Sequence, residues 1–215
     1  MDTADRRYRH VVFDVDGTLV DTERANLVSL QRLMLELTGR RYDLDDLRFS
    51  LGIPGVDALR RLGADHSDAV CRRWEQLEAM ESGSSRPFPG MVDTIRELRR
   101  RGVHAGVVSS RARGEYAQQI SPFGMDALFD QIILVEDTRR HKPDPDPLLE
   151  YLRRTGAARG EALYVGDSEY DLRCTTAAGV DFALASWGAQ HPYGGEKYVL
   201  SQPSDLLGIA PLPTR

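Results

Sequence analysis

Two aspartates one residue apart follow a short apolar run near the start of the chain. The run, Val-Val-Phe at residues 11–13, leads into Asp14, Val15, Asp16 and Gly17. An apolar run between polar residues is typical of a buried strand. Two carboxylates at the end of a buried strand are costly to desolvate unless a cation or hydrogen bonds compensate them. We therefore predict that a positively charged group binds here.

A solvated acidic turn, with Gly17 at positive φ, is the simplest alternative for Asp14 and Asp16. A calcium loop of the EF-hand kind is a second alternative, but it requires acids at its first, third and fifth positions and glycine at its sixth. Gly17 is the fourth residue counted from Asp14, so the spacing excludes an EF-hand.

Polar side chains also follow three later apolar runs of the chain. Ser109 follows the second run, Lys142 lies in the loop after the third, and Asp167 and Asp171 follow the fourth. Taken singly, Ser109 is explained as a helix N-cap, Lys142 as a solvated lysine, and the two aspartates as acids in the first turn of a helix. Their occurrence in order at successive strand ends favours one shared site, because separate coincidences are improbable together.

The segments between these residues predict the elements that position them. Residues 21–86 contain three amphipathic helical patterns without a strand, at 22–38, 54–62 and about 70–80, and lead into a linker at 83–87. Helices and strands alternate from there on. The predicted helices are 91–101, 115–120, 147–154 and one ending at 178, and the predicted strands are 103–108, 132–135, 163–165 and 180–184.

This alternation implies an α/β fold, with a Rossmann-like parallel sheet that carries helices on both faces. Ligands of such sheets bind at the carboxyl ends of the strands, where the polar residues above fall. We predict a core domain of residues 1–20 and 87–215, with a small helical domain of residues 21–86 inserted into it. The last stretch, with Pro203, Pro211 and Pro213, is expected to be a surface tail.

In this order the polar residues resemble the four motifs of the haloacid dehalogenase (HAD) superfamily. The first motif of that family is an apolar strand followed by Asp-x-Asp-Gly-Thr, as at residues 14–18, and the Lys-Pro-Asp-Pro and Gly-Asp-Ser-x-x-Asp sequences at 142–145 and 166–171 are also typical of it. The resemblance spans most of the chain and implies that the inserted helices form the family's C1 cap. It assigns Asp14 as nucleophile, Asp16 as acid/base, Ser109 as the motif-two hydroxyl, Lys142 as the motif-three lysine, and Asp167 and Asp171 as the motif-four acids.

The chemistry implied by the resemblance is phosphoryl transfer. A phosphomonoester is a dianion that repels nucleophiles, so its site must supply positive charge as well as an in-line nucleophile. Mg²⁺ suits this task, and the resemblance implies that Asp14, Asp167 and the backbone carbonyl of Asp16 bind it. Attack by Asp14 would give an aspartyl-phosphate, while Asp16 protonates the leaving oxygen and later takes a proton from water.

The other matched residues are expected to hold the phosphoryl group or to orient the groups that do. Lys142 and Ser109, with phosphate-binding backbone groups at Gly17 and Ser110, would stabilise charge in the transition state. Asp171 would orient Lys142 or a metal-bound water.

The predicted cap carries weaker signals. The stretch Ser50 to Gly55 resembles the Gly-x-Pro loop in caps of phosphoglycolate-phosphatase-like and pyrophosphatase-like members, although a plain loop before a helix explains it equally well. Arg24, Arg111 and Arg113 are candidate positive charges near the site, but each is expected to be solvated. Ser110 stands where relatives often have Asn, and Cys174-Thr175-Thr176 stands where small alanines are common, so no relative's substrate is carried over.

Composition limits the class of protein. A net charge of -5 over 215 residues, without a basic patch, argues against nucleic-acid binding, and no segment is long and apolar enough to predict a membrane span. Cys71 and Cys174 fit neither a disulfide framework nor a zinc site. We expect a cytoplasmic protein that is a monomer or a weak homodimer.

The leading hypothesis is a Mg²⁺-dependent phosphatase that hydrolyses a small phosphorylated metabolite such as a phosphoglycolate-like compound, a sugar phosphate or pyrophosphate. One alternative is a sugar phosphomutase resembling β-phosphoglucomutase, which uses the same aspartyl-phosphate. The other is a non-catalytic HAD-like protein that binds a phosphorylated ligand. A dehalogenase is disfavoured because that branch lacks the second acid, which is present here as Asp16.

Overall fold

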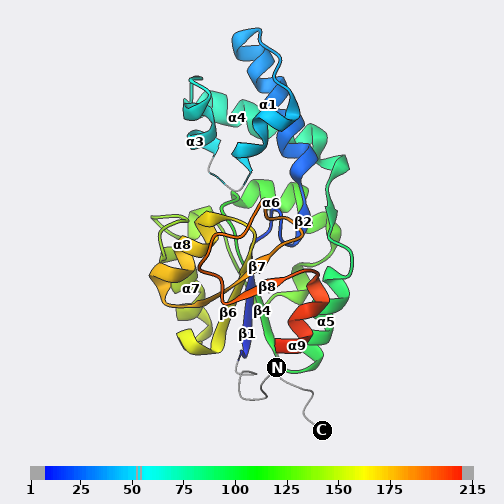
Figure 1. Cartoon of the computed structure of the whole chain (residues 1–215), viewed down its shortest axis with the longest axis vertical. Coiled ribbons are helices and arrows are strands. Elements are labelled where there is room, and N and C mark those ends of the chain that lie inside the picture. Colours follow the sequence, from blue (N-terminus) through cyan, green and yellow to red (C-terminus); the bar gives the residue numbers. More distant parts are fainter. Residues whose placement is uncertain (1–7, 52, 54, 210–215) are drawn as a thin grey trace.

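The computed structural model describes residues 8–51, 53 and 55–209, and a parallel sheet lies at its centre (Figure 1). In the described part of the chain this sheet has six strands in the order β5-β4-β1-β6-β7-β8, and each neighbouring pair is parallel. The strands are β1 (His10–Phe13), β4 (His104–Val108), β5 (Gln131–Ile133), β6 (Ala162–Gly166), β7 (Asp181–Ala185) and β8 (Tyr198–Leu200). The predicted α/β class is confirmed.

Helices cover both faces of this sheet (Figure 1). On β1, Val11 and Phe13 pack into the cluster that includes α5 (Met91–Arg100) and α9 (Leu206–Ile209), whereas Val12 packs into the cluster on the opposite face. That second cluster includes α7 (Asp146–Thr155) and α8 (Glu169–Ala178). Because successive side chains of a strand point to opposite faces, a strand buried on both sides is apolar throughout.

The strand order reverses at β1. From β1 the chain adds β4 and β5 on one side and then crosses over to add β6, β7 and β8 on the other. The carboxyl ends of β1 and β6 therefore flank the switch point, where ligands of open α/β sheets bind. Asp14 follows β1 and Asp167 follows β6, so the fold places both aspartates at this point.

The helices between β1 and α5 gather at one end of the molecule (Figure 1). They are α1 (Glu23–Thr38), α2 (Leu44–Leu47), α3 (Gly55–Arg61) and α4 (Asp68–Glu81). They bury an apolar cluster of their own, in which Leu30, Leu33 and Leu77 are fully buried. The chain enters and leaves this helical unit through a short antiparallel ribbon formed by β2 (Val20–Asp21) and β3 (Arg86–Pro87).

Two sequence predictions about the fold were wrong. Residues 198–209 are not a surface tail, because β8 extends the sheet and the side chains of Leu200, Leu206 and Ile209 are buried. The third predicted strand ends at Ile133 instead of residue 135. The proposed Gly-x-Pro loop rests on Gly52 and Pro54, which lie outside the described residues, as do Pro211 and Pro213.

The remaining predicted elements are present with ends shifted by one or two residues, and α6 (Arg113–Gln119) corresponds to the helix expected at 115–120. In the described residues, no helix combines the length and the apolar character needed to cross a membrane.

The loop after β7 packs tightly against the end of the first strand at Gly188. A Cβ atom at Gly188 would overlap the backbone carbonyl oxygen of Gly17, a residue with a φ of 70°. We expect Gly188→Ala to destabilise the protein by about 1–3 kcal/mol, because the displaced atom is backbone and cannot turn away. Urea unfolding measures this change. The control is Gly114→Ala in α6, where a Cβ would meet nothing within 4 Å; equal stability of the two variants would contradict the close packing.

Candidate active site

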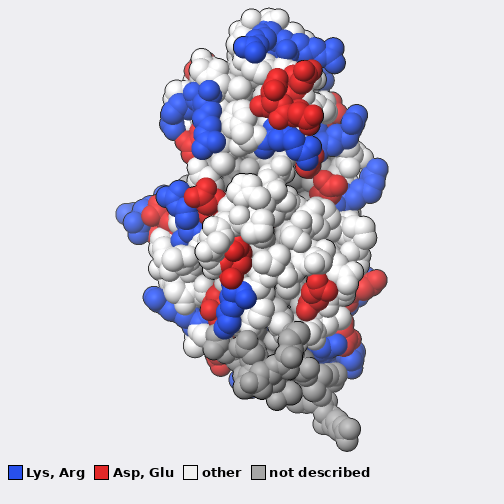
Figure 2. Space-filling view, viewed as in Figure 1, with Lys and Arg blue, Asp and Glu red and all other residues white. Residues whose placement is uncertain are grey.

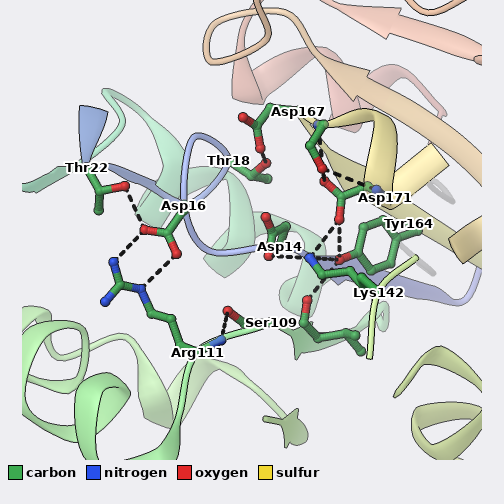
Figure 3. A network of polar contacts seen from close by, with 12 residues as sticks. Asp14, Asp16, Thr18, Thr22, Ser109, Arg111, Lys142, Tyr164, Asp167 and Asp171 are labelled. Carbon is green, nitrogen blue, oxygen red and sulfur yellow. Dashed lines mark hydrogen bonds and ion pairs between the residues drawn. The ribbon is translucent and has the colours of Figure 1, made fainter. Parts of the chain in front are cut away.

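The structure brings four of the predicted site residues together at the carboxyl edge of the sheet (Figure 3). Asp14 follows β1, Lys142 lies between β5 and α7, Asp167 follows β6, and Asp171 lies in the first turn of α8. All four are buried, with 8 % exposure or less. Residues that are far apart in sequence therefore form one polar cluster inside an apolar sheet.

Lys142 is the centre of this cluster. Its Nζ atom donates to Asp14 Oδ1 at 2.8 Å and to Asp171 Oδ1 at 2.7 Å, and lies 3.2 Å from the hydroxyl of Tyr164. Burial alone would lower the pKa of Lys142, but the two carboxylates outweigh it and raise this pKa above its ordinary value. Lys142 is thus held as a cation beside Asp14.

Asp171 is fixed from two sides. Its Oδ2 atom accepts from the backbone N–H of Ser168 at 3.1 Å and from the Ser168 hydroxyl at 2.6 Å, in the capping box that begins α8. The hydroxyl of Tyr164 lies 3.1 Å from Asp171 Oδ1 and 2.8 Å from the carbonyl oxygen of Val108. Tyr164 was missed by the sequence analysis, because in an apolar strand a tyrosine is indistinguishable from a core aromatic residue.

Asp167 lies across from Asp14 and is held by Thr18, the residue after Gly17. The Thr18 hydroxyl donates to Asp167 Oδ1 at 3.0 Å. Trp187 Nε1 donates to the carbonyl oxygen of Thr18 at 3.0 Å, and the Tyr193 hydroxyl donates to the carbonyl oxygen of Asp167, also at 3.0 Å. The loop after β7 thus fixes both strand ends that carry the aspartates.

The donor set of this cluster fits a divalent cation. Carboxylate oxygens of Asp14, Asp167 and Asp171 lie within 4.8 Å of one another. Burial raises the pKa of Asp14 to about 7 although Lys142 opposes this, and burial also raises the pKa of Asp167 well above its ordinary value. Three carboxylates against one ammonium group leave an excess of negative charge in a buried space, which a hard, oxygen-binding cation would balance.

Asp16 points away from this cluster (Figure 3). Its Oδ1 atom accepts from the Thr22 hydroxyl and from Arg111 Nη2, both at 2.6 Å, and its Oδ2 atom accepts from Arg111 Nε at 2.7 Å. Burial would raise the pKa of Asp16, but the charge and the hydrogen bonds of Arg111 outweigh it and lower this pKa. In this conformation Asp16 is a carboxylate bound to a guanidinium.

Arg111 was expected to be solvated, and that expectation was wrong. Its exposure is 6 %, and besides Asp16 it contacts Gln119 Oε1 at 2.9 Å and, with Nη2, Glu78 Oε1 at 3.6 Å. Glu78 belongs to α4, and burial raises its pKa to about 7. Arg111 therefore joins the first strand end to the helical unit, and its place directly after Ser109-Ser110 at a strand end was the available signal.

The other candidates differ in how close they lie to the cluster. Ser109 is buried, and its hydroxyl accepts from the backbone N–H of Arg111 at 3.2 Å. Ser110 is exposed. Arg113 forms an ion pair with Asp137 at 2.8 Å on the exposed side of α6, as expected for a solvated arginine.

A pocket of about 240 Å³ adjoins the cluster between the sheet edge and the helical unit. It is lined by Asp16, Gly17, Asp21, Thr22, Glu23, Arg24, Asn26, Leu51, Phe88, Asp167, Trp187 and Gly188. Because Gly17 and Asp167 belong to the strand ends, the pocket opens directly beside the proposed cation site.

A parallel α/β sheet with a helical insert after its first strand, and with buried aspartates and a lysine at its switch point, has the architecture of a Rossmann-like enzyme that binds its ligand at the carboxyl edge of the sheet. The sequence model of the haloacid dehalogenase-like hydrolase family matches residues 11–185, and the chain belongs to this family. The match includes all the residues of the cluster.

Individual relatives agree with this assignment. A phosphoglycolate phosphatase of Cereibacter sphaeroides is 36 % identical over 84 % of this chain and 86 % of its own length. Pyrophosphatase PpaX of Bacillus velezensis is 27 % identical over 95 % of this chain and 97 % of its own length. Among solved structures, a protein from Lactobacillus plantarum provisionally named phosphoglycolate phosphatase superposes with a TM-score of 0.88 at 26 % identity, covering 94 % of this chain and 99 % of its own.

Proposed function

We propose that this protein is a phosphatase that hydrolyses small phosphorylated metabolites through a covalent intermediate on Asp14. The observation that carries the proposal is the buried Asp14 carboxylate at the switch point, hydrogen-bonded to Lys142 and facing Asp167. A carboxylate can attack phosphorus without a general base to activate it. Lys142 is positioned beside Asp14 to bind the negatively charged phosphoryl group. The names of the relatives agree with this reaction class.

The cation that fits the acidic cluster is proposed to be Mg²⁺. The carboxylates of Asp14 and Asp167, with the backbone carbonyl of Asp16, would hold it. When bound, it supplies positive charge against the phosphoryl oxygens. Asp171 is less suited to bind it, because both of its carboxylate oxygens already accept hydrogen bonds.

The reaction proceeds in two displacements. Asp14 attacks phosphorus, the bond from phosphorus to the leaving oxygen breaks, and Asp16 gives its proton to that oxygen. A water then attacks the phosphorus of the aspartyl-phosphate, Asp16 takes the proton of this water, and inorganic phosphate leaves with Asp14 restored. The structure shows Asp16 as a carboxylate bound to Arg111 and Thr22. To act as the acid, it must therefore leave Arg111, take up a proton from solvent and turn towards the leaving oxygen.

The remaining residues of the cluster position these groups. Lys142 binds a phosphoryl oxygen and holds Asp14 in line, and Asp171 orients Lys142. Ser109 and the backbone groups of Gly17 and Ser110 complete the phosphate site. The helical unit of residues 21–86 acts as a cap, since it has a separate apolar core and is joined to the sheet by the two-stranded ribbon of β2 and β3.

Phosphate release tests the proposal. The panel contains phosphoglycolate, pyrophosphate, sugar phosphates and p-nitrophenyl phosphate, each with Mg²⁺ and with EDTA. We expect release that falls to background in EDTA and returns when Mg²⁺ is restored, because the acidic cluster alone repels a phosphate dianion. Release that is equal in EDTA and in Mg²⁺ would contradict the metal assignment, and isomerised product without net phosphate release would identify a mutase instead.

A further inference from the structure

The pocket beside Asp167 contains one basic side chain among its lining residues, and that side chain is Arg24. Four acids line the same pocket: Asp16, Asp21, Glu23 and Asp167. A pocket with this excess of acid repels an anionic ligand except where a cation faces it. The position of Arg24 therefore determines where in the pocket a negative group could bind.

The acids of the pocket have partners within the protein. Arg111 neutralises Asp16, and Glu23 forms an ion pair with Arg48 at 2.7 Å. Asp167 accepts from Thr18, and Asp21 accepts from the backbone N–H of Glu23 at 3.3 Å.

Unlike these acids, Arg24 has no polar partner among the described residues. It is exposed in the first turn of α1, and it makes no hydrogen bond or ion pair with any residue that the structure describes. Its guanidinium is available to a ligand without breaking an internal contact. A guanidinium presents paired N–H donors that match the oxygens of a carboxylate or a phosphate.

The rest of the pocket limits the size of that ligand. Leu51, Phe88 and Trp187 supply apolar walls, and the volume is about 240 Å³. Common ligand pockets are larger, at about 300–1,000 Å³. The leaving group of the substrate must therefore be small.

We propose that Arg24 is a specificity residue that binds a second anionic group on the leaving side of the substrate. This inference rests on the proposed phosphatase function and narrows its substrate class to small phosphate esters or anhydrides whose leaving group is itself negatively charged. Both a carboxylate and a second phosphate are anionic groups of this kind. Phosphoglycolate carries the carboxylate and pyrophosphate carries the second phosphate, so the test uses both compounds.

The test compares leaving groups of similar size and different charge. Phosphoglycolate is paired with 2-hydroxyethyl phosphate, in which a hydroxymethyl group replaces the carboxylate, and pyrophosphate is assayed beside them. We expect wild-type kcat/KM to favour the charged leaving group. Arg24→Ala should lower the ratio of kcat/KM for phosphoglycolate to that for 2-hydroxyethyl phosphate by about 10- to 100-fold, mainly through KM, because a charged hydrogen bond is lost from bound substrate.

Two further variants separate charge from structure. Arg24→Lys keeps the positive charge and should retain most of the ratio, whereas Arg41→Ala, at an exposed arginine of the same helical unit that does not line the pocket, should leave the ratio unchanged. A ratio within about threefold of wild type in Arg24→Ala, or an equal loss for both substrates, would overturn the inference. The kcat/KM of phosphoglycolate and that of pyrophosphate are compared in Arg24→Ala, and the larger loss identifies the anionic group that Arg24 binds.

A binding measurement keeps this inference separable from the phosphatase proposal. Calorimetric titration of Asp14→Asn with phosphoglycolate and with 2-hydroxyethyl phosphate, each with Arg24 intact and replaced by Ala, requires no turnover. Preferential binding of phosphoglycolate that depends on Arg24, together with no phosphate release by the wild type, would retain Arg24 as an anion-binding residue and reject the phosphatase. Equal binding of the two compounds to both variants would reject the role of Arg24.

Discussion

Asp14→Asn is expected to abolish phosphate release, with a loss on the order of 10⁴-fold or more in kcat. The amide has the shape of the carboxylate and its oxygen can still accept from Lys142 Nζ, which lies 2.8 Å from Asp14 Oδ1. It is not a nucleophile of useful strength, so the first displacement is blocked. Steady-state phosphate release with the best substrate of the panel measures this effect.

The control is Asp93→Asn, which makes the same chemical change at an exposed aspartate of α5 far from the cluster in sequence and should keep wild-type activity. The melting temperature of Asp14→Asn should be no lower than that of the wild type, because the variant removes a negative charge from a buried, acidic cluster. Turnover within tenfold of wild type in Asp14→Asn would rule out the covalent mechanism.

Lys142→Met is expected to damage both activity and stability. Removing the ammonium leaves Asp14 and Asp171 buried without their shared cation, which should cost about 3–5 kcal/mol in the free energy of unfolding. The loss of the group that binds a phosphoryl oxygen should lower kcat by about 10²- to 10³-fold. Urea unfolding in EDTA and phosphate release with Mg²⁺ measure the two effects separately.

A double variant distinguishes these two roles of Lys142. Lys142→Met combined with Asp171→Asn removes one of the unpaired charges, so it should regain part of the lost stability without regaining activity. Arg140→Met is the matched control, because Arg140 is a solvated neighbour that pairs with Asp146 at the surface and should change stability by less than about 1 kcal/mol. Near-normal kcat in Lys142→Met would remove Lys142 from the phosphate site.

The sequence predicted most of the core because its signals are local. Apolar runs bounded by polar residues identified strands such as β1 and β6, and glycines such as Gly39 and Gly179 correctly marked the ends of α1 and α8. The strand β8 was missed because it is only three residues long, lies at the edge of the sheet and buries only Leu200. An edge strand of this length has no periodic signal.

The polar contacts of the site were predicted less completely. The grouping of Asp14, Lys142 and Asp171 followed from their places at strand ends, but Arg111 did not, because arginine is rarely buried without a partner. Its partner Asp16 lies 95 positions earlier in the chain, and nothing local connects the two. The sequence therefore identified Asp16 as a residue of the site, but it did not predict that its carboxylate binds Arg111.

Residues that take no part in the proposed reaction hold the carboxylates of the cluster in position. Thr18, Ser168 and Tyr164 each hold one of the carboxylates in place through a hydrogen bond. Groups fixed in this way lose little entropy when a substrate binds. The active-site arrangement thus depends on the packing of the loops after β1, β6 and β7.

The central claim is that a phosphoryl group is transferred to Asp14, and trapping that intermediate tests it most directly. Wild-type protein is mixed with substrate and Mg²⁺, quenched within milliseconds in acid and treated with borohydride, which reduces an acyl phosphate to an alcohol. Mass spectrometry of the peptide that contains residue 14 should then show homoserine at that position, only when substrate was present and never in Asp14→Asn. Substrate turnover with an unmodified Asp14, or with the modification on another residue, would contradict the account.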